Sequence, residues 1–168
     1  MNRLALATAC GALALTASLL AVPLAAKDSL GVFGEWAAFR DAKAPRCYAI
    51  AMPAPSRLQR DFEPYATVAT WPTRKIRSQV YFRLSRTVRS GAAITLAIGR
   101  ESFTLTGGGG DAWAANRNMD AAIVTAMRSA NRMIVRATDA KGRRFSNTYA
   151  LDGAATAMDA ATVGCARR

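Results

Sequence analysis

Residues 76–85, IRSQVYFRLS, alternate apolar and polar side chains along their length. Val80, Phe82 and Leu84 share one face of an extended chain, while Arg83 lies on the other face. This period of two is typical of a β-strand with one side in a core and the other side in water. We expect this strand to lie at the centre of the fold.

Shorter alternating runs on both sides of this strand predict a mainly β protein. The pair Gly99-Arg100 separates two such runs, and a two-residue loop that begins with glycine favours a tight hairpin. We expect residues 107–110, four consecutive glycines, to end the second strand as a flexible connection. The other expected strands cover residues 32–39, 47–52, 66–71, 94–98, 103–105, 132–138 and 143–151.

The hydrophobic period changes to that of a helix after Asn118. Met119, Ile123 and Met127 recur on one helical face, and Asn118 can cap the first turn. A second helix is expected over residues 154–163. The predicted fold class is therefore mainly β: a single antiparallel β-sandwich-like domain with one or two short α-helices.

Residues 1–26 have the composition of a secretory signal peptide. Arg3 supplies an early positive charge, an apolar run follows from Leu4 to Leu24, and small residues precede Lys27. The alternative is a membrane anchor, because an apolar run of about this length can span a bilayer. We expect cleavage that leaves residues 27–168 as one periplasmic or secreted domain without a transmembrane segment.

Beyond residue 26 the sequence contains two cysteines, Cys47 and Cys165, and the whole chain contains no histidine. In an exported protein such a pair indicates a structural disulfide. A catalytic thiol is the alternative, but neither cysteine has a histidine to activate it or a partner in a Cys-x-x-Cys motif. A Cys47–Cys165 bridge would close a long loop and stabilise the fold by roughly 4 to 5 kcal/mol in the chain-entropy model.

The charge balance is strongly basic, with 23 Lys and Arg against 11 Asp and Glu and a formal net charge of +12. It favours acidic partners, namely anionic lipid headgroups, lipopolysaccharide or acidic glycans. We do not expect nucleic acid as a partner of an exported protein. The alternative is a scattered, solvated basic surface.

Positive charge is densest between residues 74 and 89, where no acidic residue occurs. On a strand, Arg77 and Arg83 would lie on the outward face with Tyr81 between them, roughly 20 Å apart. Guanidinium groups at this spacing could hold successive phosphates or sulfates. The alternative is an edge strand that charge protects against pairing with other chains. The candidate anion-binding residues are Arg74, Lys75, Arg77, Tyr81, Arg83, Arg86 and Arg89.

No arrangement of residues indicates catalysis. Asp61 and Glu63 lie in a proline-rich loop beside Arg60, where a solvated turn is expected in place of an acid–base pair. Without histidine, serine nucleophiles lack their usual base and metal ions lack their commonest ligand. We expect a non-enzymatic protein without catalytic residues, cofactors or metal ions.

A series of short segments follows one another in a recognisable order. The segments are Phe33-Gly34-Glu35-Trp36, Cys47-Tyr48, the basic strand at 74–84, Asp120-Ala121-Ala122-Ile123-Val124 followed by Met127-Arg128-Ser129, and Tyr149-Ala150-Leu151-Asp152-Gly153 with Ala157. Together they resemble the invasion-associated locus B family of alphaproteobacterial exported proteins. The resemblance implies a small periplasmic or secreted β-rich domain, linked by name to host-cell invasion and without an established enzymatic activity.

The chain departs from the pattern of that family at its cysteines. Family members carry a cysteine shortly after the opening tryptophan that can pair with the second-strand cysteine, where this chain has Ala37-Ala38-Phe39-Arg40. No cysteine lies between Cys47 and Cys165. The bridge must therefore be rewired or absent.

Two functions are consistent with these observations. The first is the binding of anionic envelope or host-surface components. The alternative is a structural or accessory periplasmic protein that contacts another protein through Trp71, Pro72 and Tyr81.

Overall fold

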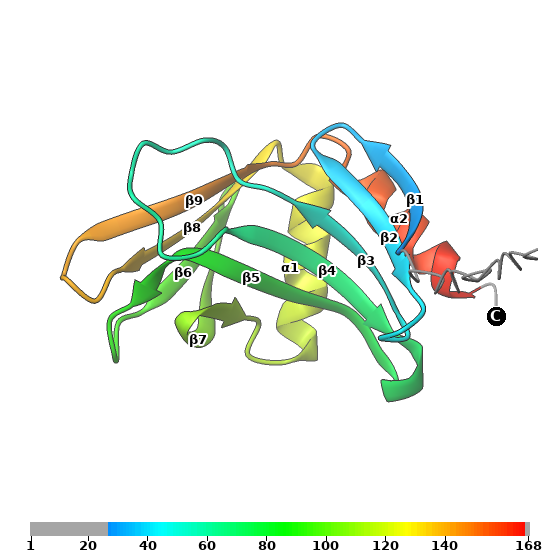
Figure 1. Cartoon of the computed structure of the whole chain (residues 1–168), viewed down its shortest axis with the longest axis horizontal. Helices are drawn as coiled ribbons and strands as arrows, with labels where there is room; N and C mark the ends of the chain where they lie inside the picture. The colour runs from blue at the N-terminus through cyan, green and yellow to red at the C-terminus, as the bar shows by residue number, and fades with distance from the viewer. Residues whose placement is uncertain (1–26, 167–168) are drawn as a thin grey trace, which may run out of the picture.

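The computed structural model describes residues 27–166, and the expected signal peptide, residues 1–26, lies outside the described residues. The described chain forms nine antiparallel strands in the sheet order β1-β2-β3-β4-β5-β7-β6-β8-β9, together with two α-helices (Figure 1). The expected mainly β, sandwich-like architecture is confirmed. The elements are β1 (Asp28–Phe33), β2 (Trp36–Asp41), β3 (Arg46–Ala51), β4 (Tyr65–Trp71), the 3-10 turn η1 (Pro72–Arg74), β5 (Ile76–Val88), β6 (Ile94–Ile98), β7 (Glu101–Trp113), α1 (Arg117–Ser129), β8 (Arg132–Thr138), β9 (Arg144–Ala150) and α2 (Ala154–Ala166).

Strand β7 belongs to both halves of the sheet. Its residues 109–113 pair with β5, whereas residues 101–105 pair with β6. Gly109 has a φ of 59°, and a side chain on Gly107 would collide with the backbone of Asp111. The expectation of a flexible connection at the glycines is therefore wrong: β7 continues through them and bends, because only glycine tolerates these backbone geometries without strain.

The face of β5 that the alternation predicts to be apolar lies in the core. Val80, Phe82 and Leu84 are each no more than 1% exposed. Both helices lie behind the half-sheet of β1–β5 in the view of Figure 1, and α1 buries Ile123 and Met127 against it. Among residues 27–166, no helix lies on the opposite face of this half-sheet.

Helix α1 is capped by Asn116, whose side chain accepts a hydrogen bond from the Met119 backbone N–H at 3.0 Å. Asn118, the expected cap, lies inside the first turn instead. Both residues have the side chain that a cap needs, so the helix start is decided by packing. The observed register brings Asp120 onto β5, where its carboxylate accepts a hydrogen bond from the Val80 backbone N–H at 2.8 Å.

The single strand expected over residues 32–39 is two strands, β1 and β2, joined by a turn at Gly34 and Glu35. Gly34 has a φ of 54°, and a side chain there would collide with Asp152. The turn is seated on the junction between β9 and α2, where the Glu35 backbone N–H donates to the Asp152 carbonyl at 3.2 Å. Contact with a distant part of the chain therefore fixes this turn.

The predicted disulfide is present and joins Cys47 of β3 to Cys165 in the last turn of α2. The bridge ties the helix to the inner face of the half-sheet. Of the two alternatives that the sequence left open, a rewired bridge or an absent one, the structure shows a bridge that links β3 to the final helix. Neither helix that the structure describes is long and apolar enough to cross a membrane.

Candidate functional site

The seven candidate anion-binding residues do not form one surface. Arg74, Lys75 and Arg77 are exposed at one end of β5, and Arg89 is exposed just beyond the other end. Strand β5 is 13 residues long, so most of its length separates the two groups. Local density of charge in the sequence thus becomes, in the fold, one cluster of three exposed cations and a single distant arginine.

Arg86 does not reach the surface. Its guanidinium donates to the Asp139 carboxylate at 2.8 Å, and the two side chains are 7% and 4% exposed. Arg143 donates to the same carboxylate. Burial opposes ionisation of Asp139, but these hydrogen bonds outweigh it and lower its pKa to about 2. Arg86 therefore joins β5 to the β8–β9 turn and is occupied by that contact.

Tyr81 and Arg83 share one carboxylate, that of Asp111 on β7. The Tyr81 hydroxyl donates to Asp111 at 2.5 Å, and the Arg83 guanidinium donates to the same oxygen at 2.6 Å. Burial and this hydrogen bond raise the pKa of Tyr81. The Arg83 guanidinium also lies 3.8 Å from the centre of the Phe62 ring. Asp111 thus neutralises the positive charge of Arg83.

The two carboxylates of the proline-rich loop also have partners. Asp61 accepts a hydrogen bond from the Thr87 backbone N–H at 2.8 Å, which lowers its pKa, and Glu63 pairs with Arg60 at 3.1 Å. They serve different contacts and do not act as a pair. Within residues 27–166, no three cysteine or carboxylate side chains gather as a metal centre would require.

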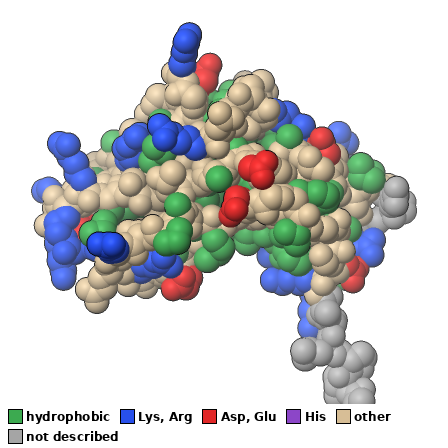
Figure 2. Space-filling model, turned by 90° about the horizontal axis from the view of Figure 1, so that it is seen from above, with side chains coloured by type: hydrophobic (Ala, Val, Ile, Leu, Met, Phe, Trp, Pro, Cys, Tyr) green, Lys and Arg blue, Asp and Glu red, His purple; other side chains and the backbone are tan. Residues whose placement is uncertain are grey.

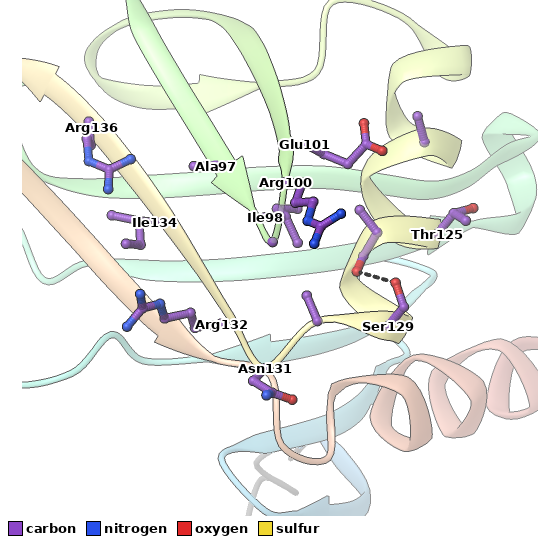
Figure 3. Close-up of a pocket in the computed structure, with 14 residues that line it drawn as sticks. Ala97, Ile98, Arg100, Glu101, Thr125, Ser129, Asn131, Arg132, Ile134 and Arg136 are labelled. Carbon is purple, nitrogen blue, oxygen red and sulfur yellow. Dashed lines mark hydrogen bonds between the residues drawn. The ribbon is translucent and has the colours of Figure 1, made fainter.

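A basic cleft of about 1020 Å³ lies between α1 and the outer face of β6 and β8 (Figure 3). Arg132 and Arg136 lie on β8 on either side of Ile134, and Arg100 reaches toward α1 from the β6–β7 turn. Small side chains of the helix form the opposite wall and keep the cleft open. The wall residues of α1 are Ala122, Thr125, Ala126 and Ser129.

Charge in the basic cleft is unbalanced. Glu101 is the acidic side chain among its lining residues, against three arginines. Within the described part of the chain, none of Arg100, Arg132 and Arg136 forms an ion pair with a carboxylate. A guanidinium without an acidic partner retains its donors for an external anion.

The positive charge extends beyond the cleft along the same strands. Arg136 also lines a neighbouring hollow together with Arg144. Arg144 lies on β9, opposite Thr138 of β8. From Arg132 to this pair the strand rises roughly 20 Å. Figure 2 shows Lys and Arg side chains gathered at the end of the molecule that carries the β8–β9 turn. The outer face of the half-sheet formed by β6, β8 and β9 therefore carries a basic strip. It consists of Arg100, Arg132, Arg136 and Arg144.

Sequence reasoning did not identify this strip. The alternation in residues 132–138 places Arg132 and Arg136 on one face of a strand, and this signal was available. The position of Arg100 beside them depends on the pairing of β6 with β8, and the wall depends on where α1 lies. Neither relationship leaves a local pattern in the sequence.

One solved structure matches this arrangement of strands and helices: the crystal structure of invasion associated protein B from Bartonella henselae. The match has a TM-score of 0.58 and covers 79% of this chain and 95% of that chain, with 12% sequence identity. The two proteins share a fold. The resemblance seen in the sequence is thereby supported as a distant structural relationship. No protein-family model matches the sequence, and no curated protein matches it.

The segments that carry the resemblance hold the fold together. The Trp36 indole N–H donates to the Ala150 carbonyl at 2.9 Å, Asp120 binds the backbone of β5, and Tyr149 is fully buried with its ring 6.0 Å from that of Phe82. The resemblance seen in the sequence therefore rests on segments with a structural role. It leaves the basic strip as a feature to be judged on its own geometry.

Proposed function

We propose that this chain is an exported, non-catalytic protein of the periplasm or cell exterior that binds anionic envelope or host-surface components through the basic cleft. The observation that carries the proposal is the set of three arginines, Arg100, Arg132 and Arg136, that line the cleft and form no ion pair with a carboxylate of residues 27–166. The ligand groups are phosphates or sulfates, as found on lipid headgroups, lipopolysaccharide and acidic glycans.

Compartment and chemistry agree in this proposal. The Cys47–Cys165 disulfide indicates an oxidising, extracytoplasmic compartment. Anionic envelope surfaces are the abundant polyanions there. The relationship to invasion associated protein B supports the same placement. A strip of guanidinium groups suits a repeating anion because each planar fork binds two oxygens of one phosphate or sulfate.

Retention on phosphatidylglycerol vesicles and on a heparin resin tests the proposal. The double variant Arg132→Glu, Arg136→Glu should lose most of its retention at low salt and elute from heparin well before the wild type. The control variant Lys43→Glu, Lys75→Glu makes the same change of net charge at exposed residues outside the cleft and should elute close to the wild type. Wild-type retention should weaken steeply with added salt, because screening acts on charge-driven contacts.

Equal losses in the two double variants would mean that net charge alone controls retention and would overturn the assignment to the cleft. A preference for the resin over the vesicles would identify the ligand as a sulfated glycan, and the reverse preference would identify a lipid headgroup. Both preferences are forms of the proposed function.

A further inference from the structure

A second concave surface lies on the other half of the sheet, on the face away from the helices. This aromatic groove has a volume of about 580 Å³ and is formed by the outward side chains of β3, β4, β5 and the end of β7. Its walls are five aromatic residues and its floor is small or polar. The aromatic residues are Tyr48, Tyr65, Trp71, Tyr81 and Trp113, and the floor residues are Thr67, Ala69 and Gln79.

The strand register explains why the surface is hollow. Ala69 of β4 lies between Tyr48 of β3 and Gln79 of β5, and Thr67 lies beside Tyr81. Tyr81 in turn pairs with Trp113 of β7. The small side chains in the middle of β4 lie between the large rings at its two ends and those of the neighbouring strands, which leaves a trough. Its sides are rings that offer flat apolar faces.

Arg46 is fixed at one end of the aromatic groove. Its guanidinium carbon lies 4.7 Å from the centre of the Tyr48 ring and 5.1 Å from that of Trp71, distances at which a cation is attracted to an aromatic face. Its Nε lies 3.8 Å from the Asp41 carboxylate, beyond hydrogen-bond reach. Within the described residues the Arg46 side chain donates no hydrogen bond, and its Nε is buried without an acceptor. The group is oriented while its donors stay unused.

Trp71, which also lines the groove, has a donor that is likewise buried without an acceptor among the described residues. This donor is the indole N–H. A buried donor without an acceptor costs free energy, which an acceptor oxygen of a ligand recovers only when the side chains that cover the donor move aside. Arg46 and Trp71 touch each other, so one ligand can engage both.

Charge around the groove favours an acidic ligand. Lys27 lies 6.0 Å from the centre of the Tyr48 ring, and the Arg74 guanidinium lies 4.9 Å from that of Trp71. With Arg46, three cations surround one end of the groove, where Asp41 is the nearby carboxylate. An anionic group on the ligand would be drawn to this end.

The position of the groove in the sheet distinguishes a saccharide from an extended peptide. Strands β3 and β4, on which most of the groove lies, are each paired on both sides along it, so a peptide backbone can add to neither of them. Recognition must come from side chains: rings that stack on flat apolar faces, and donors that meet hydroxyl and carboxylate oxygens. A pyranose ring that carries a carboxylate presents both kinds of surface.

We propose that the aromatic groove binds an acidic saccharide of the uronic acid type, with its carboxylate on Arg46 and its sugar rings on the aromatic walls. This binding goes beyond the proposed anion contact and does not depend on the basic cleft, because the two surfaces lie on different halves of the sheet.

Titration with trigalacturonate, and with its fully methyl-esterified form as the uncharged control, tests the proposal. Tryptophan indole N–H signals in nitrogen-correlated proton spectra provide the readout. Trigalacturonate should shift the signals of Trp71 and Trp113 and leave that of Trp36 in place, because the Trp36 indole is in the core and already bonded. The methyl ester should bind at least tenfold more weakly, because it lacks the carboxylates.

Two variants separate recognition from folding. Arg46→Gln should weaken trigalacturonate binding roughly 10- to 100-fold, the range expected for loss of charge-assisted hydrogen bonds. Arg40→Gln removes one positive charge from the neighbouring strand outside the groove and should change binding less than twofold. Arg46→Lys should fall between wild type and Arg46→Gln, because it keeps the charge and loses the planar fork.

Several results would overturn the proposal. They are equal binding of acid and methyl ester, no shift of the Trp71 signal with either sugar, and equal effects of the Arg46→Gln and Arg40→Gln variants. Tighter binding of a short peptide with a free C-terminal carboxylate than of trigalacturonate would also overturn it, in favour of a protein partner. Arg132→Glu, Arg136→Glu should bind trigalacturonate like the wild type, and Arg46→Gln should keep its retention on vesicles, so that each proposal fails separately.

Discussion

The indole N–H of Trp36 donates a hydrogen bond to the carbonyl oxygen of Ala150 at 2.9 Å, across 114 residues of sequence. The contact joins the first hairpin to the last strand, beside the point where the Gly34 turn meets Asp152. Trp36 is 1% exposed and belongs to the core. The start and the end of the β domain are thus held by one buried side chain as well as by the disulfide.

Replacement of Trp36 by phenylalanine should lower the free energy of unfolding by about 2 kcal/mol. The change leaves a cavity and an unpaired carbonyl in place of the indole. Denaturant unfolding followed by circular dichroism measures the loss. Trp113→Phe is the matched control, because Trp113 is 39% exposed, and it should change stability by less than about 0.5 kcal/mol. Similar losses in both variants would argue against this role of Trp36.

Removal of the disulfide should destabilise the fold by about 4 kcal/mol. The bridged residues are 118 apart in sequence, and the unfolded chain regains the freedom of a long loop when the link is cut. The variant Cys47→Ala, Cys165→Ala and reduced wild-type protein should unfold at similarly lowered denaturant concentrations. A double variant as stable as the oxidised protein would contradict this expectation.

The glycine run in β7 should respond very differently at neighbouring positions. Gly109→Ala should cost about 1 kcal/mol, because the residue has a φ of 59° in open surroundings. Gly107→Ala should cost more, because its side chain would meet the Asp111 backbone. Gly108 has open space and no positive φ, so Gly108→Ala should be neutral or stabilising by up to about 1 kcal/mol. Equal effects at the three positions would mean that β7 does not bend as described.

The Asp139 carboxylate should make the free energy of unfolding depend on pH in the acid range. Its pKa in the folded protein is about 2, below the value of about 4 in an unfolded chain. A carboxylate with a lowered pKa stabilises the fold above pH 4, and the contribution is lost as the pH falls from about 4 to about 2. Urea unfolding of wild type and Asp139→Asn at pH 7, 4 and 2.5 should give a difference that shrinks across this window.

Asp28→Asn provides the control for that experiment. Asp28 pairs with Arg40 in an exposed ion pair, with side chains 51% and 38% exposed, and such pairs contribute little. We expect its effect to be small at every pH. A difference between wild type and Asp139→Asn that stays constant from pH 7 to 2.5 would refute the assigned role of Asp139.

Local patterns were sufficient for the elements that are buried on one face. The alternation around Phe82 predicts β5, and the four-residue spacing of Met119, Ile123 and Met127 predicts α1. The turn at Gly34 was missed because apolar residues on both sides of it read as one strand. Its position depends on Asp152, and no local pattern records that contact.

The candidate binding surfaces were less predictable for a related reason. The density of charge along the chain predicts an anion-binding surface at residues 74–89. In the fold, however, Arg83 pairs with Asp111, and Arg86 pairs with Asp139. Conversely, the arginines of the basic cleft come from β8 and from the β6–β7 turn, and become neighbours only after the sheet forms. Which charges remain available to a ligand is a property of tertiary pairing.

The disulfide between β3 and α2 limits when during folding it can form. Both sulfur atoms end in the interior, with Cys47 0% and Cys165 8% exposed, so an oxidant can reach the thiols only before the helix settles on the sheet. Cys47 lies in the third described strand and Cys165 lies after the ninth, so Cys47 is synthesised 118 residues before its partner. The bond can therefore form only on a chain whose nine described strands have all been synthesised.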